Sequence, residues 1–199
     1  MKYVCMDTSH RHLVIALIED QTVVAGCAIP SWKKQSETIF PKWIELMDQA
    51  GWQASQIGAL VVSVGPGSYT GVRIAMTIAK VFATTRNVPL YTLSTLQLYA
   101  GMMENAYVML DARSNRAYVG KLHNGVFIEE PSIKTLDEIK AERNDDLNLI
   151  GDLDLLGMPK TEVDFVANFC DLKPLWQLVQ NPHTLVPCYL KEQSAYLVK

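Results

Sequence analysis

The chain has 199 residues, of which 49% are hydrophobic and 20% are charged, and its formal net charge is −3 at pH 7. This hydrophobic fraction excludes a largely disordered chain, and the length allows one domain or two small ones. The slightly negative charge disfavours a protein that binds nucleic acid unaided, because such proteins carry a basic excess.

The cysteines and the N-terminal residues indicate the expected cellular compartment. The four cysteines are scattered without a Cys-x-x-Cys pair, which favours buried free thiols in a reducing environment. The longest apolar run near the N-terminus, residues 13–18, is too short for a signal peptide or a membrane span. We therefore expect a cytoplasmic protein that does not associate with membranes.

The first 50 residues predict a meander of three strands and then a helix. Alternating apolar residues place strands at 3–6, 12–18 and 22–29, with polar turns between them. Over residues 36–50 the apolar side chains fall on one side of a helical wheel. This segment is therefore expected to be an amphipathic helix that lies on the meander.

Residues 60–86 predict a buried strand, a glycine-rich turn and a long helix. The turn reads Gly-Pro-Gly-Ser-Tyr-Thr-Gly at residues 65–71, and Ser68 or Thr70 is placed to cap the helix. Over residues 72–86 the polar side chains form one narrow stripe. The remaining apolar arc spans roughly 220°, about twice the roughly 100° that a surface helix buries. A further surface must therefore cover this helix.

The element order continues with a strand at 89–93 and a helix from Ser94 to about residue 103. The order β-β-β-α-β-α-β-α is ribonuclease-H-like. Near residue 106 the pattern restarts, since Asp111 follows an apolar strand as Asp7 does, at an offset of about 104 residues. We predict an α/β, actin-like ATPase (ASKHA) fold of two duplicated lobes, residues 1–103 and 104–199. The second lobe is eroded, and its last segment is expected to pack back on the first.

The two Asp-bearing turns occupy the positions at which actin-like phosphotransferases hold magnesium and nucleotide. Neither Asp7 nor Asp111 is followed by a glycine where the backbone would have to approach a phosphate. We expect both carboxylates to cap their own turns. A small-molecule kinase of the actin-like superfamily is the alternative function.

The glycine-rich turn has two interpretations. Its amides, with an arginine near the helix start, can hold a nucleotide or an anion; alternatively, the glycines only allow tight packing of strand against helix. The residues proposed for nucleotide or anion contact are Gly67, Ser68, Thr70 and Arg73.

Histidine spacing argues against a metal site. His10 and His12 point the same way from an extended chain, but no third ligand is near in sequence, and His123 and His183 stand alone. We expect ordinary surface histidines, no metal ligand and no catalytic residue. A metallopeptidase is the least favoured alternative.

Four stretches resemble the bacterial TsaB family, also called YeaZ. Residues 65–74 closely resemble its glycine-rich signature, and residues 35–41 resemble its His-Ser-Glu helix start with a proline, except that Gln35 replaces the histidine. Residues 110–119 resemble the strand that opens its second lobe. Residues 187–191 resemble its C-terminal Pro-x-Tyr-Leu-Arg/Lys motif.

The resemblance implies a non-catalytic subunit of the complex that adds threonylcarbamoyl to the adenosine 3′ of the anticodon, in tRNAs that read codons beginning with A. In that family the paralogue TsaD carries the metal and the chemistry, and the ATPase TsaE joins the complex. It follows that ATP or ADP and metal are expected on partner subunits, with no cofactor on this chain alone, and that tRNA is contacted only through the complex.

The excess apolar surface predicts where a partner binds. Two helices of this chain and a like pair from TsaD, or from a second copy when TsaD is absent, are expected to form a four-helix interface. The sequence leaves two outward lines open, Val72, Met76, Ala79 and Ala83 or Ile78 and Phe82. We favour the first, with Trp43 and Met47 beside it, because its small residues let a partner backbone approach. The candidate interface residues are Ile39, Trp43, Met47, Val72, Met76, Ala79, Phe82 and Ala83.

Overall fold

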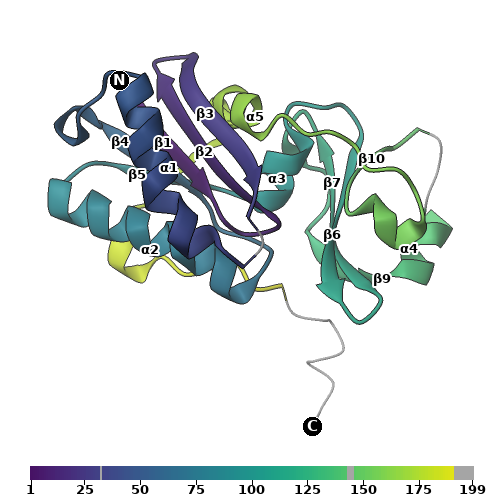
Figure 1. Cartoon of the computed structure of the whole chain (residues 1–199). Coiled ribbons are helices and arrows are strands. Elements are labelled where there is room, and N and C mark those ends of the chain that lie inside the picture. Colours follow the sequence, from purple (N-terminus) through teal and green to yellow (C-terminus); the bar gives the residue numbers. More distant parts are fainter. Residues whose placement is uncertain (32, 143–145, 191–199) are drawn as a thin grey trace, which may run out of the picture.

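The computed structural model describes residues 1–31, 33–142 and 146–190. Two β-sheets lie side by side, and helices cover their faces, so that the chain forms two α/β lobes (Figure 1). In these described ranges no helix is long and apolar enough to cross a membrane.

The larger sheet has six strands in the order β11-β5-β4-β1-β2-β3. Strands β1, β2 and β3 form the predicted antiparallel meander, and β4 and β5 continue the sheet in parallel with β1. This strand order is that of a ribonuclease-H-like lobe. The strands are β1 Lys2–Asp7, β2 His12–Glu19, β3 Thr22–Pro30, β4 Ala59–Ser63, β5 Leu90–Leu93 and β11 Gln177–Leu178.

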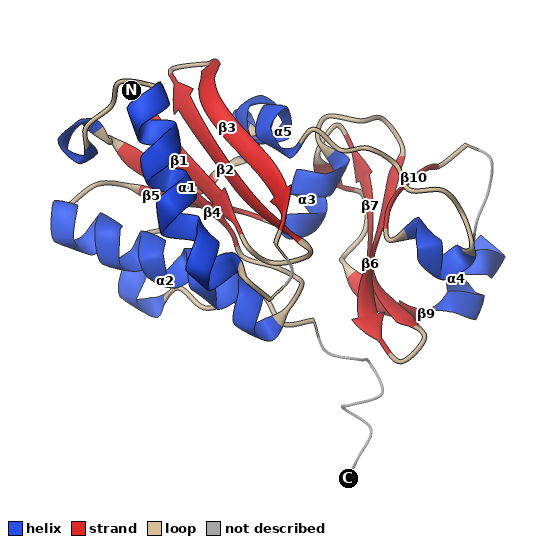
Figure 2. Ribbon diagram, viewed as in Figure 1, coloured by secondary structure: helices blue, strands red, loops and turns tan. Residues whose placement is uncertain are grey.

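Helices cover both faces of this sheet (Figure 2). On one face, α1 and α2 bury one apolar cluster, and on the other, α3 and α5 bury a second. Ser68 and Ser94 cap α2 and α3, as their place before each helix predicts. The helices are α1 Gln35–Gln49, α2 Tyr69–Arg86, α3 Thr95–Ala100 and α5 Phe165–Asp171.

The smaller sheet repeats the layout of the first. Strands β6 and β7 are antiparallel and joined by the second Asp-bearing turn, as β1 and β2 are by the first, and β10 runs parallel to β6 as β4 does to β1. A helix, α4 Leu136–Glu142, packs on this lobe. The strands are β6 Ala106–Arg113, β7 Arg116–His123, β8 Val126–Phe127, β9 Ser132–Thr135 and β10 Asn148–Gly151.

The two lobes share one apolar core. The cluster beneath α3 and α5 contains Val14 and Val61 from the large sheet together with Val108, Leu110 and Ile150 from the small one. Burial of a common apolar core favours a fixed arrangement of the lobes. The division at residue 103, with lobes 1–103 and 104–199, stays a prediction.

Residues 179–190, here called the C-terminal strap, run along the first lobe beside α2. The Val179 N–H donates to the Leu90 carbonyl oxygen at 2.9 Å, and the Cys188 N–H donates to that of Val64 at 2.7 Å. Leu90 is the first residue of β5, and Val64 directly follows the last residue of the parallel strand β4, so the two acceptors lie towards opposite ends of this strand pair. The strap is therefore hydrogen-bonded to the first lobe at both ends of this strand pair.

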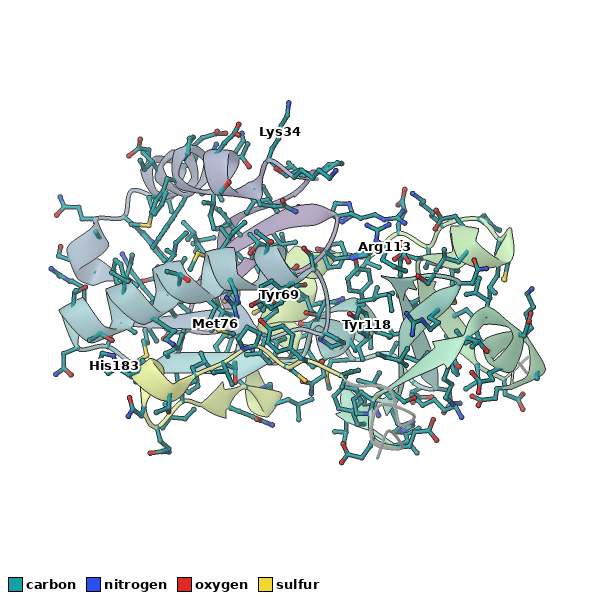
Figure 3. The ribbon with its side chains drawn as sticks, turned by 90° about the horizontal axis from the view of Figure 1, so that it is seen from below. Lys34, Tyr69, Met76, Arg113, Tyr118 and His183 are labelled. Carbon is teal, nitrogen blue, oxygen red and sulfur yellow. The ribbon has the colours of Figure 1, made fainter. Side chains whose placement is uncertain are left out.

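Lysine 80 fastens the strap to α2 directly. The Lys80 Nζ donates to the carbonyl oxygens of His183 and Leu185 at 3.1 and 2.8 Å. Figure 3 shows the strap passing along α2 beside Met76, which is only 3% exposed. The strap thus covers part of the apolar arc that the large sheet leaves open.

Candidate functional site

A cleft of about 520 Å³ lies between the lobes at the N-terminal end of α2. The first lobe contributes the glycine-rich turn and the start of α1, and the second contributes the end of β6 and Tyr118 of β7. Tyr69 marks the first side in Figure 3, and Arg113 and Tyr118 mark the second. The lining residues are His10, Lys33, Gln35, Ser36, Gly67, Ser68, Tyr69, Thr70, Gly71, Ile74, Asp111, Ala112, Arg113 and Tyr118.

The glycine-rich turn is packed tightly against the turn between β1 and β2. A Cβ atom on Gly67 would lie 2.3 Å from the Ser9 carbonyl oxygen, and one on Gly71 would lie 2.3 Å from that of Thr8. The Ser68 hydroxyl accepts the Gly71 N–H at 3.2 Å and so caps α2. Because no larger residue allows this approach, packing accounts for both glycines.

The residues proposed for nucleotide or anion contact divide into two groups. Gly67, Ser68 and Thr70 line the cleft. Arg73 is directed elsewhere, since its Nε donates to the Tyr189 hydroxyl at 3.0 Å and its guanidinium lies over the Tyr69 ring at 4.1 Å. Contact of the first three with a ligand stays a prediction.

The bond between Arg73 and Tyr189 joins the glycine-rich signature to the C-terminal motif. Tyr189 also stacks on Tyr69, with ring centroids 5.3 Å apart. The two motifs are far apart in sequence but meet beside the cleft. Lys191, the last residue of the C-terminal motif, lies outside the described residues.

Both aspartates cap their own turns, as predicted. Asp7 Oδ1 accepts the Ser9 N–H at 3.1 Å and also the hydroxyl of Ser63. Asp111 Oδ1 accepts the Arg113 N–H at 2.8 Å, and its Oδ2 accepts from the Arg113 guanidinium at 2.9 Å. Each carboxylate is therefore held by its own turn and its immediate neighbours.

The expectation that all histidines lie on the surface is wrong for His10, which is 6% exposed. Its Nε2 lies 2.7 Å from Asp152 Oδ2, and this carboxylate also accepts the Asp111 N–H at 2.7 Å. Asp152 thereby joins the β1–β2 turn to the second lobe beside the cleft. In the sequence, Asp152 is recognisable as a carboxylate at the end of a short apolar strand, as Asp7 is. Nothing in the sequence indicates that it pairs with His10, which lies 142 positions away.

The ionisation of Asp152 is controlled by these contacts. Burial raises the pKa of Asp152, but the hydrogen bond and charge of His10 lower it, as do the Asp111 N–H and the Arg11 charge. The net result is a pKa below the ordinary value of 3.8. The carboxylate is therefore ionised at neutral pH and available as an acceptor.

Other residues with ligand chemistry are dispersed. In the part of the chain that the structure describes, no group of three His, Cys, Asp or Glu residues lies close enough to hold a metal ion. His123 and His183 are exposed, as expected. All four cysteines are free, but only Cys5 is buried as expected; Cys27 and Cys170 are half-buried, and Cys188, on the strap, is exposed.

The sequence matches a protein-family model over residues 28–173, and that model is described as TsaD, tRNA N6-adenosine threonylcarbamoyltransferase. Two relatives are named tRNA threonylcarbamoyladenosine biosynthesis protein TsaB. The one from Bacillus subtilis is 33% identical over 60% of this chain and 54% of its own length. The one from Escherichia coli is 28% identical over 74% of this chain and 68% of its own length. The chain belongs to the TsaB/YeaZ family.

Solved structures of the TsaB/YeaZ family support the fold. A structure titled YeaZ from Pseudomonas aeruginosa superposes with a TM-score of 0.74 at 21% identity, covering 95% of this chain and 99% of that one. A second, titled an uncharacterized protein with similarity to peptidase YEAZ from the same organism, gives a TM-score of 0.78 at 19% identity, covering 96% and 99%. The predicted actin-like fold is confirmed. The aligned part spans about half to two thirds of the length of the curated TsaB relatives.

The residues predicted to form a TsaB-type interface are mostly buried within the chain. The favoured outward line is wrong: Val72, Met76, Ala79 and Ala83 are at most 3% exposed. Ala79 and Ala83 belong to the apolar cluster on the large sheet. Met76 lies beside the strap (Figure 3), and Val72 is near strap residue Cys188, since a Cβ atom on Gly65 would lie 3.6 Å from Val72 Cγ2 and 3.0 Å from the Cys188 carbonyl oxygen. The prediction failed for two reasons: Ala79 and Ala83 face the large sheet, and the C-terminal segment, which was expected to pack back on the first lobe, lies along α2 on the side of Met76. Contact of any of the eight residues with another chain stays a prediction.

The outward side of the two helices is a different apolar line, here called the helix ridge. It consists of Phe40, Ile44, Val81 and Phe82. Phe40, Ile44 and Val81 are between 51% and 60% exposed. Phe82 is partly buried, and it is the one candidate interface residue that is also a member of the ridge. Large apolar side chains gathered on one face typically mark a protein interface.

Proposed function

We propose that this chain is the non-catalytic pairing subunit of a tRNA threonylcarbamoyladenosine complex. Membership of the TsaB/YeaZ family supports the proposal, as do the relatives named tRNA threonylcarbamoyladenosine biosynthesis protein. In this role the chain pairs with a TsaD-type catalytic paralogue and recruits a TsaE-type ATPase. It contributes to threonylcarbamoyl transfer without performing the chemistry.

The observation that carries the proposal is the helix ridge. Ile44 on α1 is 60% exposed and Val81 on α2 is 58% exposed, so these apolar side chains remain in water in the isolated chain. The TsaD family model matches residues 28–173, which include both helices. A TsaD-type chain therefore offers a related pair of helices, and two such pairs can bury their apolar faces as a four-helix contact.

The remaining parts of the proposal concern ligands and location. Metal and ATP or ADP act on the partner subunits, and Gly67, Ser68 and Thr70 offer cleft-lining polar groups for a nucleotide or an anion at the subunit junction. The net charge of −3 supports tRNA binding through the complex rather than by this chain alone. The complex is expected in the cytoplasm, and the isolated chain can pair with a second copy.

The proposed pairing is tested by introducing a charged residue into the helix ridge. Ile44→Glu should abolish co-elution with the TsaD-type paralogue of the same organism, because pairing would bury an unpaired carboxylate at a cost of several kcal/mol. The matched control is Ile128→Glu, which changes an isoleucine of 63% exposure on the second lobe. Size-exclusion chromatography with circular dichroism measures pairing and folding together. A folded Ile44→Glu chain that pairs as well as the wild type contradicts the proposal.

A further inference from the structure

An exposed pair of tyrosine rings lies beside the cleft, where the glycine-rich turn meets the C-terminal strap. Tyr69 is 59% exposed and Tyr189 is 43% exposed, although their rings stack on each other at an interplanar angle of 18°. Arg73 joins the two, since its guanidinium lies over the Tyr69 ring and its Nε donates to the Tyr189 hydroxyl. These three residues are here called the tyrosine platform. In Figure 3, Tyr69 lies beside the strap on the first-lobe side of the cleft.

The guanidinium of Arg73 is held in place but can still bind another group. Only its Nε is used in the bond to Tyr189. Its Nη atoms have no partner among the described residues, and no carboxylate there pairs with Arg73. The side chain is exposed to solvent. Arg73 therefore presents oriented N–H donors of the kind that bind phosphate oxygens.

The surfaces on either side of the platform carry more cations than carboxylates. Among the described residues, the charged side chains that line the cleft are Lys33, Arg113 and Asp111, and this one carboxylate pairs with Arg113. A groove of about 490 Å³ between α1 and α2 includes Tyr69 and Arg73, and no carboxylate of the described chain lines it. The whole chain has a net charge of −3, so this basic excess is local. A local excess of this sign attracts an anionic partner.

We infer that the tyrosine platform binds an unpaired nucleotide of the tRNA, with its base on the tyrosine rings and an adjoining phosphate on Arg73. The inference rests on the proposed role in a threonylcarbamoyladenosine complex and adds a direct contact between this chain and the RNA. Exposed aromatic rings next to an arginine suit an unpaired nucleotide, because every base offers a face for stacking. Paired bases fit less well, since their faces are already stacked within the duplex.

The spread of the cations favours RNA over a protein segment. Lys33 and Arg73 lie on the first lobe and Arg113 on the second, so the positive charges extend across the cleft from the platform. Successive phosphates of one strand match such a spread, whereas an acidic side chain of a peptide meets a single cation. The net negative charge of the chain keeps this contact weak until the complex supplies further RNA-binding surface.

The rings are tested with Tyr69→Ala and Tyr69→Phe in the complex with the TsaD-type paralogue. Tyr69→Ala should weaken tRNA binding roughly tenfold, a loss typical of one base stacked on one aromatic ring. Tyr69→Phe keeps the ring and should bind tRNA as the wild type does. The matched control is Val186→Ala on the strap, where the side chain is 69% exposed, and its binding should not change. Unchanged tRNA binding by a folded Tyr69→Ala complex would overturn the inference.

The phosphate contact is tested with Arg73→Gln. At about 150 mM salt this variant should bind tRNA roughly fivefold more weakly, and the slope of log Kd against log salt concentration should fall by about one, because one phosphate contact is lost. A role limited to holding the strap would leave this slope unchanged. The matched control is Arg86→Gln at the other end of α2, which is also exposed and should keep the wild-type slope. A wild-type slope for Arg73→Gln would overturn the inference.

The inference and the proposed function fail in distinguishable ways. A wild-type chain that does not bind the TsaD-type paralogue, or a complex that does not bind tRNA, overturns both. A wild-type complex that binds tRNA, with Tyr69→Ala and Arg73→Gln binding it equally well, overturns the inference alone. Titration with ATP and with the TsaE-type ATPase covers the other occupants. Weaker binding of either by Tyr69→Ala, with tRNA binding unchanged, would assign the platform to a free nucleotide or a protein instead.

Discussion

Thr8 and Gly71 fix the start of α2 on the turn between β1 and β2. The Thr8 hydroxyl donates to the Gly71 carbonyl oxygen at 2.7 Å and accepts the Ala75 N–H at 3.0 Å. This inserts a side-chain oxygen into the first turn of the helix. The hydroxyl and the missing Cβ of Gly71 together set how closely the helix approaches the sheet.

Gly71→Ala should therefore destabilise the fold. The added Cβ would lie 2.3 Å from the Thr8 carbonyl oxygen, a backbone atom that cannot move without shifting the β1–β2 turn. We expect a loss of about 1–3 kcal/mol in the free energy of unfolding, typical of overpacking. The control is Gly58→Ala, whose Cβ comes close only to the flexible Met1 side chain, at 2.9 Å, and stays 3.5 Å from the nearest backbone atom, the Lys2 carbonyl oxygen. Urea unfolding of both variants measures the difference; equal losses would contradict the account.

Asp152→Asn tests the pair that joins the two lobes. It should lower the free energy of unfolding by about 1–3 kcal/mol at pH 7, because a buried charged acceptor is lost. Since the pKa of Asp152 is below 3.8 in the folded chain, its stabilisation is present at neutral pH and is lost as the pH falls through that lower value. The difference between wild type and variant should therefore shrink towards pH 3. A difference that is constant with pH, measured by urea unfolding, would contradict this assignment.

At the scale of elements, the C-terminal strap determines which face of α2 is outward. Lys80 holds the strap through two carbonyl oxygens, and Arg73 holds it through Tyr189. These contacts bury the Val72 and Met76 side of the helix. The face left for another protein is therefore the one that carries Val81.

Lys80→Met should loosen the strap while leaving α2 in place. The methionine keeps much of the side-chain length but cannot donate to the carbonyl oxygens of His183 and Leu185, so these lose a charged donor. Amide hydrogen exchange over residues 182–190 should accelerate roughly tenfold, with exchange in β4 unchanged. Lys34→Met, at an exposed position before α1, is the matched control. Unchanged exchange in the strap would contradict its attachment through Lys80.

Local patterns predicted the elements but not the contacts between distant segments. Apolar periodicity and turn residues predicted the meander, both long helices, the Ser68 and Ser94 caps and the two Asp turns, because each depends on neighbouring residues. The burial of His10 against Asp152 and of Met76 beneath the strap depends on residues more than 100 positions away. The spacing of apolar residues gives no information about such long-range contacts. The burial of His10 and the outward face of α2 were therefore predicted wrongly.

At the scale of the whole molecule, the two lobes present two separate surfaces. The cleft between them is lined by both Asp111 and the glycine-rich turn, whereas the helix ridge lies on the first lobe alone. A partner that covers the ridge need not disturb the His10–Asp152 pair or the shared core. This separation is consistent with a subunit that pairs through one face while keeping its own two-lobed structure intact.

The most direct test of the central claim is the threonylcarbamoyladenosine content of tRNA after a reconstituted reaction, measured by mass spectrometry. The reaction contains the TsaD-type paralogue, the TsaE-type ATPase, tRNA and threonylcarbamoyl-adenylate. We predict modified tRNA only when both the TsaD-type paralogue and this chain are present, loss of the product with Ile44→Glu, and normal product with Ile128→Glu. Modification by this chain without the TsaD-type paralogue, or full activity of Ile44→Glu, would contradict the claim that it is a non-catalytic pairing subunit.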